Sequence, residues 1–115
     1  MSDCLFCRIV AKEIPATVVA ESDTLLAFRD IDPKAPTHVL VIPKAHYATA
    51  AELATADPAL AGQMLALAGR IADDEGVAAD GYRLMFNTGR NGGQEVFHVH
   101  LHLFGGRPLG PMLAG

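Results

Sequence analysis

The chain changes its hydrophobic period along its length, and each change marks a different kind of element. Short runs rich in β-branched and apolar residues, bounded by Pro, Gly, Ser or Asp, predict five strands at residues 17–20, 24–28, 37–42, 82–87 and 96–104. Between the third and fourth runs, apolar side chains recur at helical spacing: Leu60, Met64, Leu67 and Ile71. An order of strands, helix and strands predicts an α+β fold with an antiparallel sheet.

Capping residues set the bounds of two helices in the middle of the chain. Thr49 precedes Glu52 by three residues, a capping-box spacing that predicts the start of a short helix. Asp57 and Pro58 then provide an N-cap and a first-turn proline for the long helix that carries the apolar stripe, and Gly76 ends it. We expect the long helix to pack its stripe against the sheet.

The size and charge of the chain exclude several classes of protein. With 115 residues, 50% of them hydrophobic, the sequence predicts a single domain over residues 1–115. There are 9 Lys+Arg against 13 Asp+Glu, a formal charge of −4, and the basic residues do not cluster, which argues against a nucleic-acid partner. No apolar run approaches the roughly 18 residues of a membrane span, and the first residues do not resemble a signal peptide. A cytoplasmic protein without a membrane partner is expected.

A row of histidines near the C-terminus carries the strongest functional signal. Because side chains alternate between the two faces of a strand, His98, His100 and His102 should share one face. The opposite face should then hold the apolar side chains Phe97, Val99, Leu101 and Leu103. Three imidazoles on one face are difficult to explain by core packing, although buried histidines with satisfied hydrogen bonds are the structural alternative.

Two kinds of chemistry fit this row. His-x-His on a strand can chelate a metal ion that activates water, but no Asp or Glu follows closely to complete the ligand set. Alternatively, a neutral imidazole is a nucleophile at pH 7, and its phosphoryl adduct hydrolyses readily. The glycine-rich segment 87–94 favours this second chemistry, because its free backbone N–H groups can form an anion nest beside the row.

The residues around the row resemble a known family. Residues 97–103, preceded by Asn87 and Gly92-Gly93-Gln94, are similar to the signature of the histidine triad (HIT) superfamily. The resemblance to its Hint branch, the purine nucleoside phosphoramidases, extends over most of the chain, through residues 13–15, 27–31, 35–44, 81–83 and 105–114. It implies a HIT-like α+β fold, with an antiparallel meander sheet of about five strands, one long packing helix and a short helix.

The resemblance places catalytic roles on four histidines. The middle histidine of the motif is the family's nucleophile, which forms a nucleotidyl-histidine intermediate, and that position here is His100. His102 matches the residue that contacts the phosphate, His38 matches a histidine that supports the nucleophile, and His98 opens the triad. The implied reaction is hydrolysis of the P–N bond of purine nucleoside phosphoramidates, with release of a nucleoside monophosphate. The resemblance implies no cofactor for this reaction.

The resemblance also implies a nucleotide-binding site. The base would lie among the apolar residues Phe6, Ile9, Ile14, Phe28 and Ile31. Asp30 would accept hydrogen bonds from both ribose hydroxyls, for which one carboxylate is well suited. The phosphate would be lined by Asn87, Gly93 and Val96. Glu95, in the same segment, departs from the family's pattern, because many Hint proteins have serine there and a carboxylate repels phosphate unless it is protonated or turned away.

A second departure is the Cys-x-x-Cys pair formed by Cys4 and Cys7, which resembles a zinc-binding branch of the superfamily. Structural zinc takes four ligands, and in that branch the other two match His46 and His98 here. The resemblance therefore implies a structural zinc that braces the triad from behind. Two small buried thiols are the alternative, whereas a thioredoxin-like redox pair is disfavoured because no strand precedes it.

Two other functions stay open from the sequence. One is a dinucleoside polyphosphate hydrolase on the same fold, which differs from a phosphoramidase in its leaving group. The other is a nucleotide-binding regulatory or scaffold protein, which would keep its role after loss of His100. The partners implied by the resemblance are conjugates of AMP or GMP and a second copy of the chain, since family members form homodimers.

Overall fold

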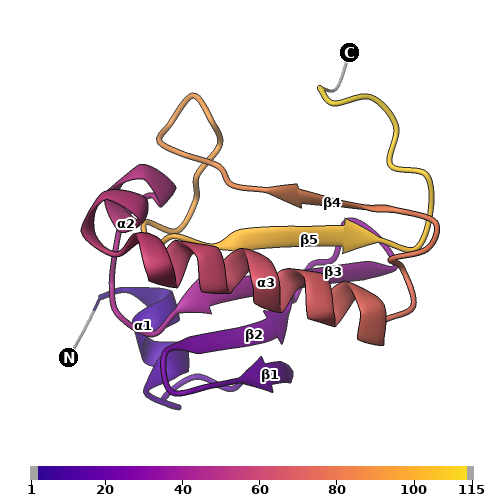
Figure 1. Cartoon of the computed structure of the whole chain (residues 1–115). Helices are drawn as coiled ribbons and strands as arrows, with labels where there is room; N and C mark the ends of the chain where they lie inside the picture. Colours follow the sequence, from indigo (N-terminus) through magenta and orange to yellow (C-terminus); the bar gives the residue numbers. More distant parts are fainter. Residues whose placement is uncertain (1–2, 114–115) are drawn as a thin grey trace.

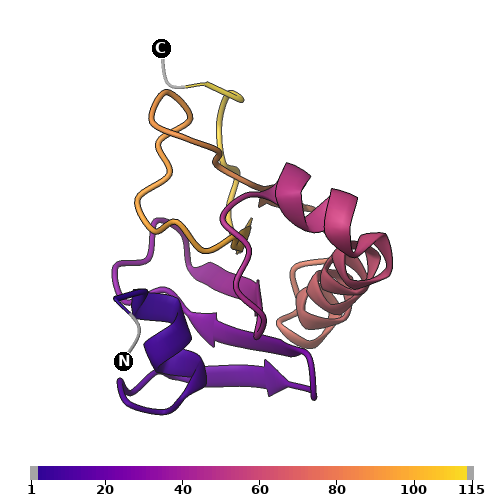
Figure 2. The same ribbon diagram turned by 90° about the vertical axis from the view of Figure 1, so that its left-hand side faces the viewer.

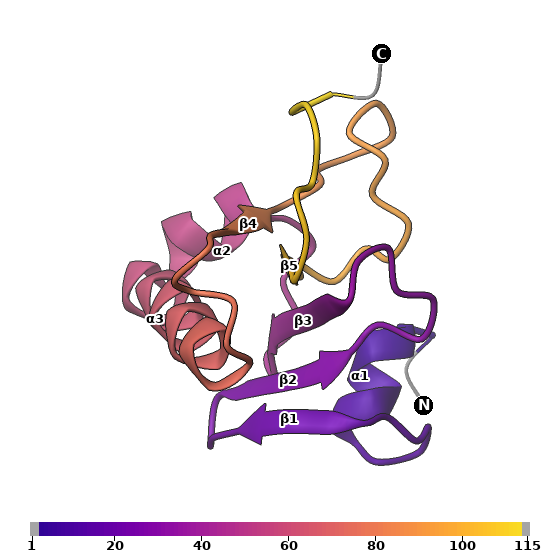
Figure 3. The ribbon, with the colours of Figure 1, turned by 90° about the vertical axis from the view of Figure 1, so that its right-hand side faces the viewer.

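The computed structural model describes residues 3–113, which form a five-stranded antiparallel sheet with helices on both faces (Figure 1). The strands are β1 Val18–Glu21, β2 Leu25–Arg29, β3 Thr37–Pro43, β4 Tyr82–Met85 and β5 Leu101–Gly105. The helices are α1 Leu5–Val10, α2 Ala50–Ala56 and α3 Pro58–Asp74. Figures 2 and 3 show α2 and α3 on one face of the sheet and α1 on the other.

The strand order, β1-β2-β3-β5-β4, departs in one place from the expected meander. After β3 the chain leaves the sheet through α2 and α3, returns at the far edge as β4, and turns back so that β5 fills the gap beside β3. The register pairs Leu40 of β3 with His102 of β5, and His38 with Phe104. This pairing places histidines of two strands next to one another near the centre of the sheet.

Alternation along the strands divides the buried side chains into two clusters. Val39 and Val41 of β3 belong to the cluster covered by α3, together with Met64 and Ile71 of its apolar stripe. The intervening Leu40 and Ile42 face the other way, into a cluster that Phe6 of α1 completes. All seven positions of β3 are buried because helices cover both of its faces. The predicted packing of the long helix against the sheet is confirmed.

The predicted helix caps are present, and one further helix was not predicted. Thr49 Oγ1 accepts a hydrogen bond from the Glu52 N–H at 3.1 Å, and Asp57 Oδ1 accepts one from the Leu60 N–H at 3.1 Å. The six-residue α1 begins at Leu5, is capped by the sulfur of the preceding Cys4, and is too short to show a helical period in the sequence. Within residues 3–113, no helix is long and apolar enough to cross a membrane.

The last strand starts later than the predicted 96–104, at Leu101. Pro43, at the end of β3, has no N–H to continue the ladder, and its carbonyl accepts a hydrogen bond from the ring of His98 at 2.8 Å. The Val99 N–H instead donates to the Tyr47 carbonyl at 2.7 Å. The prediction that Phe97 shares a buried apolar face is wrong, because Phe97 precedes the strand and its side chain is 56% exposed.

Candidate active site

A cleft of about 780 Å³ lies on the α1 side of the sheet, where Phe6 and Ile9 of that helix line it. His38, His100 and His102 line it, whereas His98 lies behind them and is fully buried. The cleft also brings together every residue for which the sequence predicts nucleotide binding: Phe6, Ile9, Ile14, Phe28, Asp30, Ile31, Asn87, Gly93, Glu95 and Val96. These residues come from α1 and the loop after it, from β2 and the loop after it, and from the segment between β4 and β5, so folding unites distant parts of the sequence.

One part of the cleft wall is aromatic and apolar. The rings of Phe6 and Phe28 meet edge to face, with centroids 5.5 Å apart, and both side chains are buried. Ile9 and Ile14 extend this wall and are partly exposed, whereas Ile31 stands fully exposed at the rim. An aromatic and aliphatic wall of this kind suits the flat face of a heterocyclic base.

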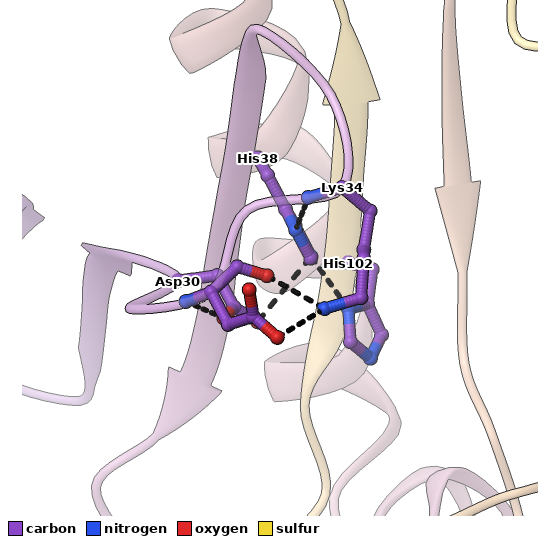
Figure 4. A network of polar contacts seen from close by, with 5 residues as sticks. Asp30, Lys34, His38 and His102 are labelled. Atoms are coloured by element: carbon purple, nitrogen blue, oxygen red, sulfur yellow. Dashed lines mark hydrogen bonds and ion pairs between the residues drawn. The ribbon is translucent and has the colours of Figure 1, made fainter.

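His38 and His102 are linked by a chain of hydrogen bonds that begins at a backbone amide (Figure 4). The Lys34 N–H donates to His38 Nδ1 at 3.1 Å, so neutral His38 carries its proton on Nε2. That Nε2 donates to His102 Nδ1 at 3.0 Å, with Asp30 Oδ2 at 3.5 Å as a second neighbour. Neutral His102 therefore carries its proton on Nε2, an atom with no hydrogen-bond partner among residues 3–113. His102 is prepared to donate a hydrogen bond to a ligand.

His100 has the opposite tautomer. Its Nδ1 donates to the backbone carbonyl of His98 at 2.9 Å, which leaves a lone pair on Nε2. The edge of the ring packs on Phe6, with centroids 5.0 Å apart, and the ring lies 4.9 Å from that of His102. A lone pair on His100 thus lies beside a hydrogen-bond donor on His102, which is the arrangement required to attack a phosphorus atom whose oxygens need stabilisation.

Burial keeps these imidazoles neutral at pH 7. It lowers the pKa values of His38 and His100 below the ordinary 6.5. For His102, burial together with the neighbouring His100 and His38 lowers the pKa to about 4. A nucleophilic imidazole must be unprotonated, so the environment supplies the reactive form without a separate base.

A second cluster lies directly behind the cleft. The ligand atoms of Cys4, Cys7, His46 and His98 all lie within 4.8 Å of one another, close enough to hold a metal ion. The Nδ1 atom of His98 is 3.4 Å from the sulfur of Cys4. The Nδ1 atoms of His46 and His98 are 3.2 Å apart. A tetrahedral zinc site places sulfur about 3.6 Å from nitrogen and two nitrogens about 3.3 Å apart, given usual bond lengths. The spacing of these four residues therefore fits zinc.

The backbone also sets the tautomer of the innermost ligand. His98 Nε2 donates to the Pro43 carbonyl, so its Nδ1 lone pair faces the cysteines. Phe6 lies between the two cysteines on α1, and its ring contacts both His98, at a centroid distance of 6.0 Å, and His100. Cys4, Cys7, His46 and His98, which we call the metal-type cluster, are consequently packed together with the aromatic wall of the cleft.

Two contributions to the site were not predicted as functional. Lys34 acts through its backbone N–H, and a contact made by the backbone cannot be predicted from a residue pattern. Gln94, noticed only as part of the motif, is buried and holds the glycine-rich segment in place. Its side chain accepts from the Gly89 N–H at 2.9 Å and donates to the Ala48 carbonyl at 2.7 Å. The sequence Gly92-Gly93-Gln94 could have indicated this role, because a glutamine side chain can hydrogen-bond the backbone of a glycine-rich segment.

Comparison with known proteins identifies the class of protein that this fold and site define. The HIT domain family matches residues 11–109, and the chain belongs to that family. The HIT-like fold expected from the motifs is confirmed by solved structures. A HIT family hydrolase from Legionella pneumophila is 53% identical, with a TM-score of 0.91 over 94% of this chain and 96% of that one. One from Clostridium thermocellum is 40% identical, with a TM-score of 0.93 over 99% of each chain.

Among curated relatives, the purine nucleoside phosphoramidase of Escherichia coli K12 is 51% identical over 110 residues, which span 96% of this chain and 92% of that protein. Protein HitA of Neisseria gonorrhoeae is 46% identical over 105 residues, 91% of this chain and 97% of that protein. The predicted membership of the histidine triad superfamily is thus confirmed.

The hydrogen-bond chain predicts the tautomers that nitrogen NMR of ¹⁵N-histidine-labelled protein will detect. At pH 7, His102 should be protonated on Nε2 and His100 on Nδ1, and His102 should titrate near 4. Because that pKa lies below the 6.5 of an unperturbed histidine, His102 makes the folded state lose stability as the pH falls from 6.5 toward 4. In His38→Ala, loss of the neighbouring imidazole should raise the pKa of His102. Titration of wild-type His102 near 6.5, or a proton on its Nδ1, would contradict this arrangement.

Proposed function

We propose that this chain is a hydrolase that cleaves the P–N bond of purine nucleoside phosphoramidates through a covalent intermediate on His100. The observation that carries the proposal is the unprotonated Nε2 of His100, held by the His98 carbonyl beside the Nε2–H donor of His102 in one cleft. Membership of the HIT domain family and the relationship to a purine nucleoside phosphoramidase support it.

The cleft gives each part of a nucleotide a place. The base packs against the Phe6 and Phe28 wall, with Ile9, Ile14 and Ile31 around it. Asp30 accepts hydrogen bonds from the ribose hydroxyls. Asn87, Gly93 and Val96, in the segment that Gln94 anchors, line the phosphate. This placement directs the phosphorus atom toward the histidines.

The reaction then proceeds in two displacements. His100 Nε2 attacks phosphorus and the P–N bond breaks, while the departing nitrogen takes a proton and leaves as an amine. The Nε2–H of His102 hydrogen-bonds a phosphoryl oxygen and stabilises the charge that develops there, and the proton for the departing nitrogen comes from solvent water in the open cleft. Water next attacks the nucleotidyl-histidine, and neutral imidazole leaves with release of the nucleoside monophosphate. No side chain of the cluster Cys4, Cys7, His46 and His98 forms a bond in either step, and His98 contributes through its backbone carbonyl, which orients His100.

Substitution of the nucleophile tests the proposal. We expect wild type to release AMP from adenosine phosphoramidate at the same rate with and without a chelator. His100→Ala should lose at least about 10³-fold in kcat/KM, since covalent catalysis depends on one atom. Chromatography of the products provides the measurement, and circular dichroism checks that the variant folds. Equal AMP release by His100→Ala would refute the proposal. Release abolished by chelator in protein that keeps its circular dichroism spectrum would indicate metal catalysis.

We also propose that Cys4, Cys7, His46 and His98 hold a structural zinc ion. Their spacing and the tautomer of His98 support this assignment. The ion would brace α1 against the triad, since Phe6 lies between the two cysteines. The homodimer, the single-domain organisation, the absence of a nucleic-acid partner and the cytoplasmic location stay predictions from the sequence.

The zinc proposal predicts one zinc ion per chain in protein purified without chelator, and none in the double variant Cys4→Ser, Cys7→Ser. A ligand that binds only the folded state stabilises it by about 2.7 kcal/mol at one hundred times its Kd. Chelator should therefore lower the Tm of wild type and leave that of the double variant unchanged. Elemental analysis and calorimetry provide the two measurements. Folded wild type that takes up no zinc and has two titratable thiols would rule the site out.

A further inference from the structure

The charged side chains along the cleft are unusual for a site that handles phosphate. Within the described part of the chain, the charged residues that line it are Arg29, Asp30, Asp32, Lys34 and Glu95. Carboxylates thus outnumber cations, and the three histidines of the cleft are neutral at pH 7 for the reasons given above. A cleft of this composition lacks the excess of positive charge that a substrate with several phosphates needs.

Both cations of the cleft already have carboxylate partners. Arg29 makes a two-pronged contact with Glu75, at 2.7 and 3.0 Å. Lys34 Nζ lies 2.7 Å from Asp32 Oδ2 and 2.8 Å from the Asp32 carbonyl. The Lys34 pair is exposed and contributes little stability, so Lys34 can turn toward a phosphate. That turn would leave the Asp32 carboxylate unpaired beside the same cleft, so the net charge around the substrate stays negative.

Of the carboxylates that line the cleft, Asp30 and Asp32 take part in hydrogen bonds or ion pairs with described residues, and Glu95 differs from them. Asp30 accepts a hydrogen bond from the Asp32 N–H at 2.8 Å and lies 3.5 Å from His38 Nε2. The side chain of Glu95, in contrast, is exposed and makes no hydrogen bond or ion pair with residues 3–113. Its backbone is nevertheless fixed, because the preceding Gln94 is buried and hydrogen-bonded to the Ala48 carbonyl. Asp32 is the main group that raises the pKa of Lys34, and Glu95 adds to this at longer range, without a direct contact. A negative charge that no ion pair neutralises is therefore held at a defined point of the cleft wall.

The position of Glu95 relates it to the leaving group. It lies between Gly93 and Val96, which the proposed function places around the phosphate. With the nucleoside against the aromatic wall of Phe6 and Phe28, as the proposed function has it, the group on the other side of the phosphorus is directed to the rest of the cleft, which Glu95 lines.

We propose that Glu95 makes the enzyme select its leaving group by charge. Amines that carry a further ammonium group, as diamines do, are favoured, whereas amines with a carboxylate and polyphosphate leaving groups are disfavoured. This inference rests on the proposed function and defines its substrate class more narrowly. It also supplies a physical reason why a dinucleoside polyphosphate, with several negative charges in its leaving group, is a poorer substrate for this cleft.

Three substrates whose leaving groups share a three-carbon chain test the inference. They are adenosine 5′-phosphoramidates of propylamine, 1,3-diaminopropane and 3-aminopropanoate, whose distal ends are neutral, cationic and anionic. Each hydrolysis consumes one water and yields AMP and the amine, so the bond broken is the same throughout. For every protein, kcat/KM is expressed relative to its own value with the propylamine substrate. This ratio cancels any general loss of activity that a substitution causes.

For wild type we expect kcat/KM about fivefold higher for the cationic substrate than for the neutral one, and about fivefold lower for the anionic one, as for unit charges several ångströms apart in a partly solvated cleft. The isosteric Glu95→Gln should bring both ratios close to one. Asp73→Asn, an equal charge change at an exposed position of α3 on the other face of the sheet, should keep the wild-type ratios. Raising the salt concentration should narrow the wild-type spread.

The outcomes separate this inference from the proposed function. Equal kcat/KM for all three substrates in wild type, or an unchanged spread in Glu95→Gln, overturns the charge selection and leaves the phosphoramidase proposal standing. Failure of wild type to release AMP from the propylamine substrate overturns the proposed function itself, and the charge selection with it. A loss of the spread in Asp73→Asn equal to that in Glu95→Gln would also overturn the assignment to Glu95.

Discussion

Hydrogen bonds from the backbone determine what each central histidine can do. An imidazole has two nitrogens, and a backbone group that occupies one of them decides whether the other donates or accepts. The His98 carbonyl commits His100 Nδ1 and leaves a lone pair on Nε2, whereas the Lys34 N–H, acting through His38, leaves His102 with an Nε2–H donor. The nucleophile His100 and the hydrogen-bond donor His102 are thus the same type of side chain, two residues apart, in different tautomers.

The sheet register makes these backbone contacts possible. β3 and β5 pair so that Leu40 lies opposite His102, which brings His38 of β3 alongside the ring of His102. The β3–β5 ladder ends at Val41 and Leu101, and beyond it the carbonyl of Pro43 accepts a hydrogen bond from His98 Nε2, which turns His98 Nδ1 toward the cysteines. One interruption of strand pairing therefore separates the reactive histidines, which line the cleft, from a histidine whose lone pair faces a metal-type cluster. Phe6 contacts both groups and links the stability of α1 to the shape of the cleft.

The sequence predicts most of the fold because its signals are local. Caps at Thr49 and Asp57 and the stripe from Leu60 to Ile71 depend on neighbouring residues, and these predictions are confirmed. Local patterns could not reveal that β5 lies between β3 and β4, since pairing across the sheet depends on where the chain returns after α3. Alternation also failed at Phe97, where the segment follows the loop at Tyr47 instead of β3.

The candidate site, like the fold, could be predicted from the sequence only in part. Residue types and motifs predicted which side chains would gather, and the cleft contains them. Contacts made by backbone atoms, such as that of the Lys34 amide, have no residue signature and required coordinates. The ion pair of Arg29 also depends on three-dimensional distances, because Glu75 is remote from it in the sequence. Motifs therefore gave the participants of the site, and the structure gave their protonation and charge balance.

The central claim is that His100 forms a covalent bond to phosphorus, and stereochemistry at phosphorus tests it most directly. A P-chiral adenosine phosphoramidothioate would be hydrolysed in ¹⁸O-labelled water, and the configuration of the resulting thiophosphate determined. Two successive in-line displacements, first by His100 and then by water, invert the centre twice, so the account predicts overall retention. Overall inversion would show that water attacks the substrate directly and would contradict the nucleophilic role of His100.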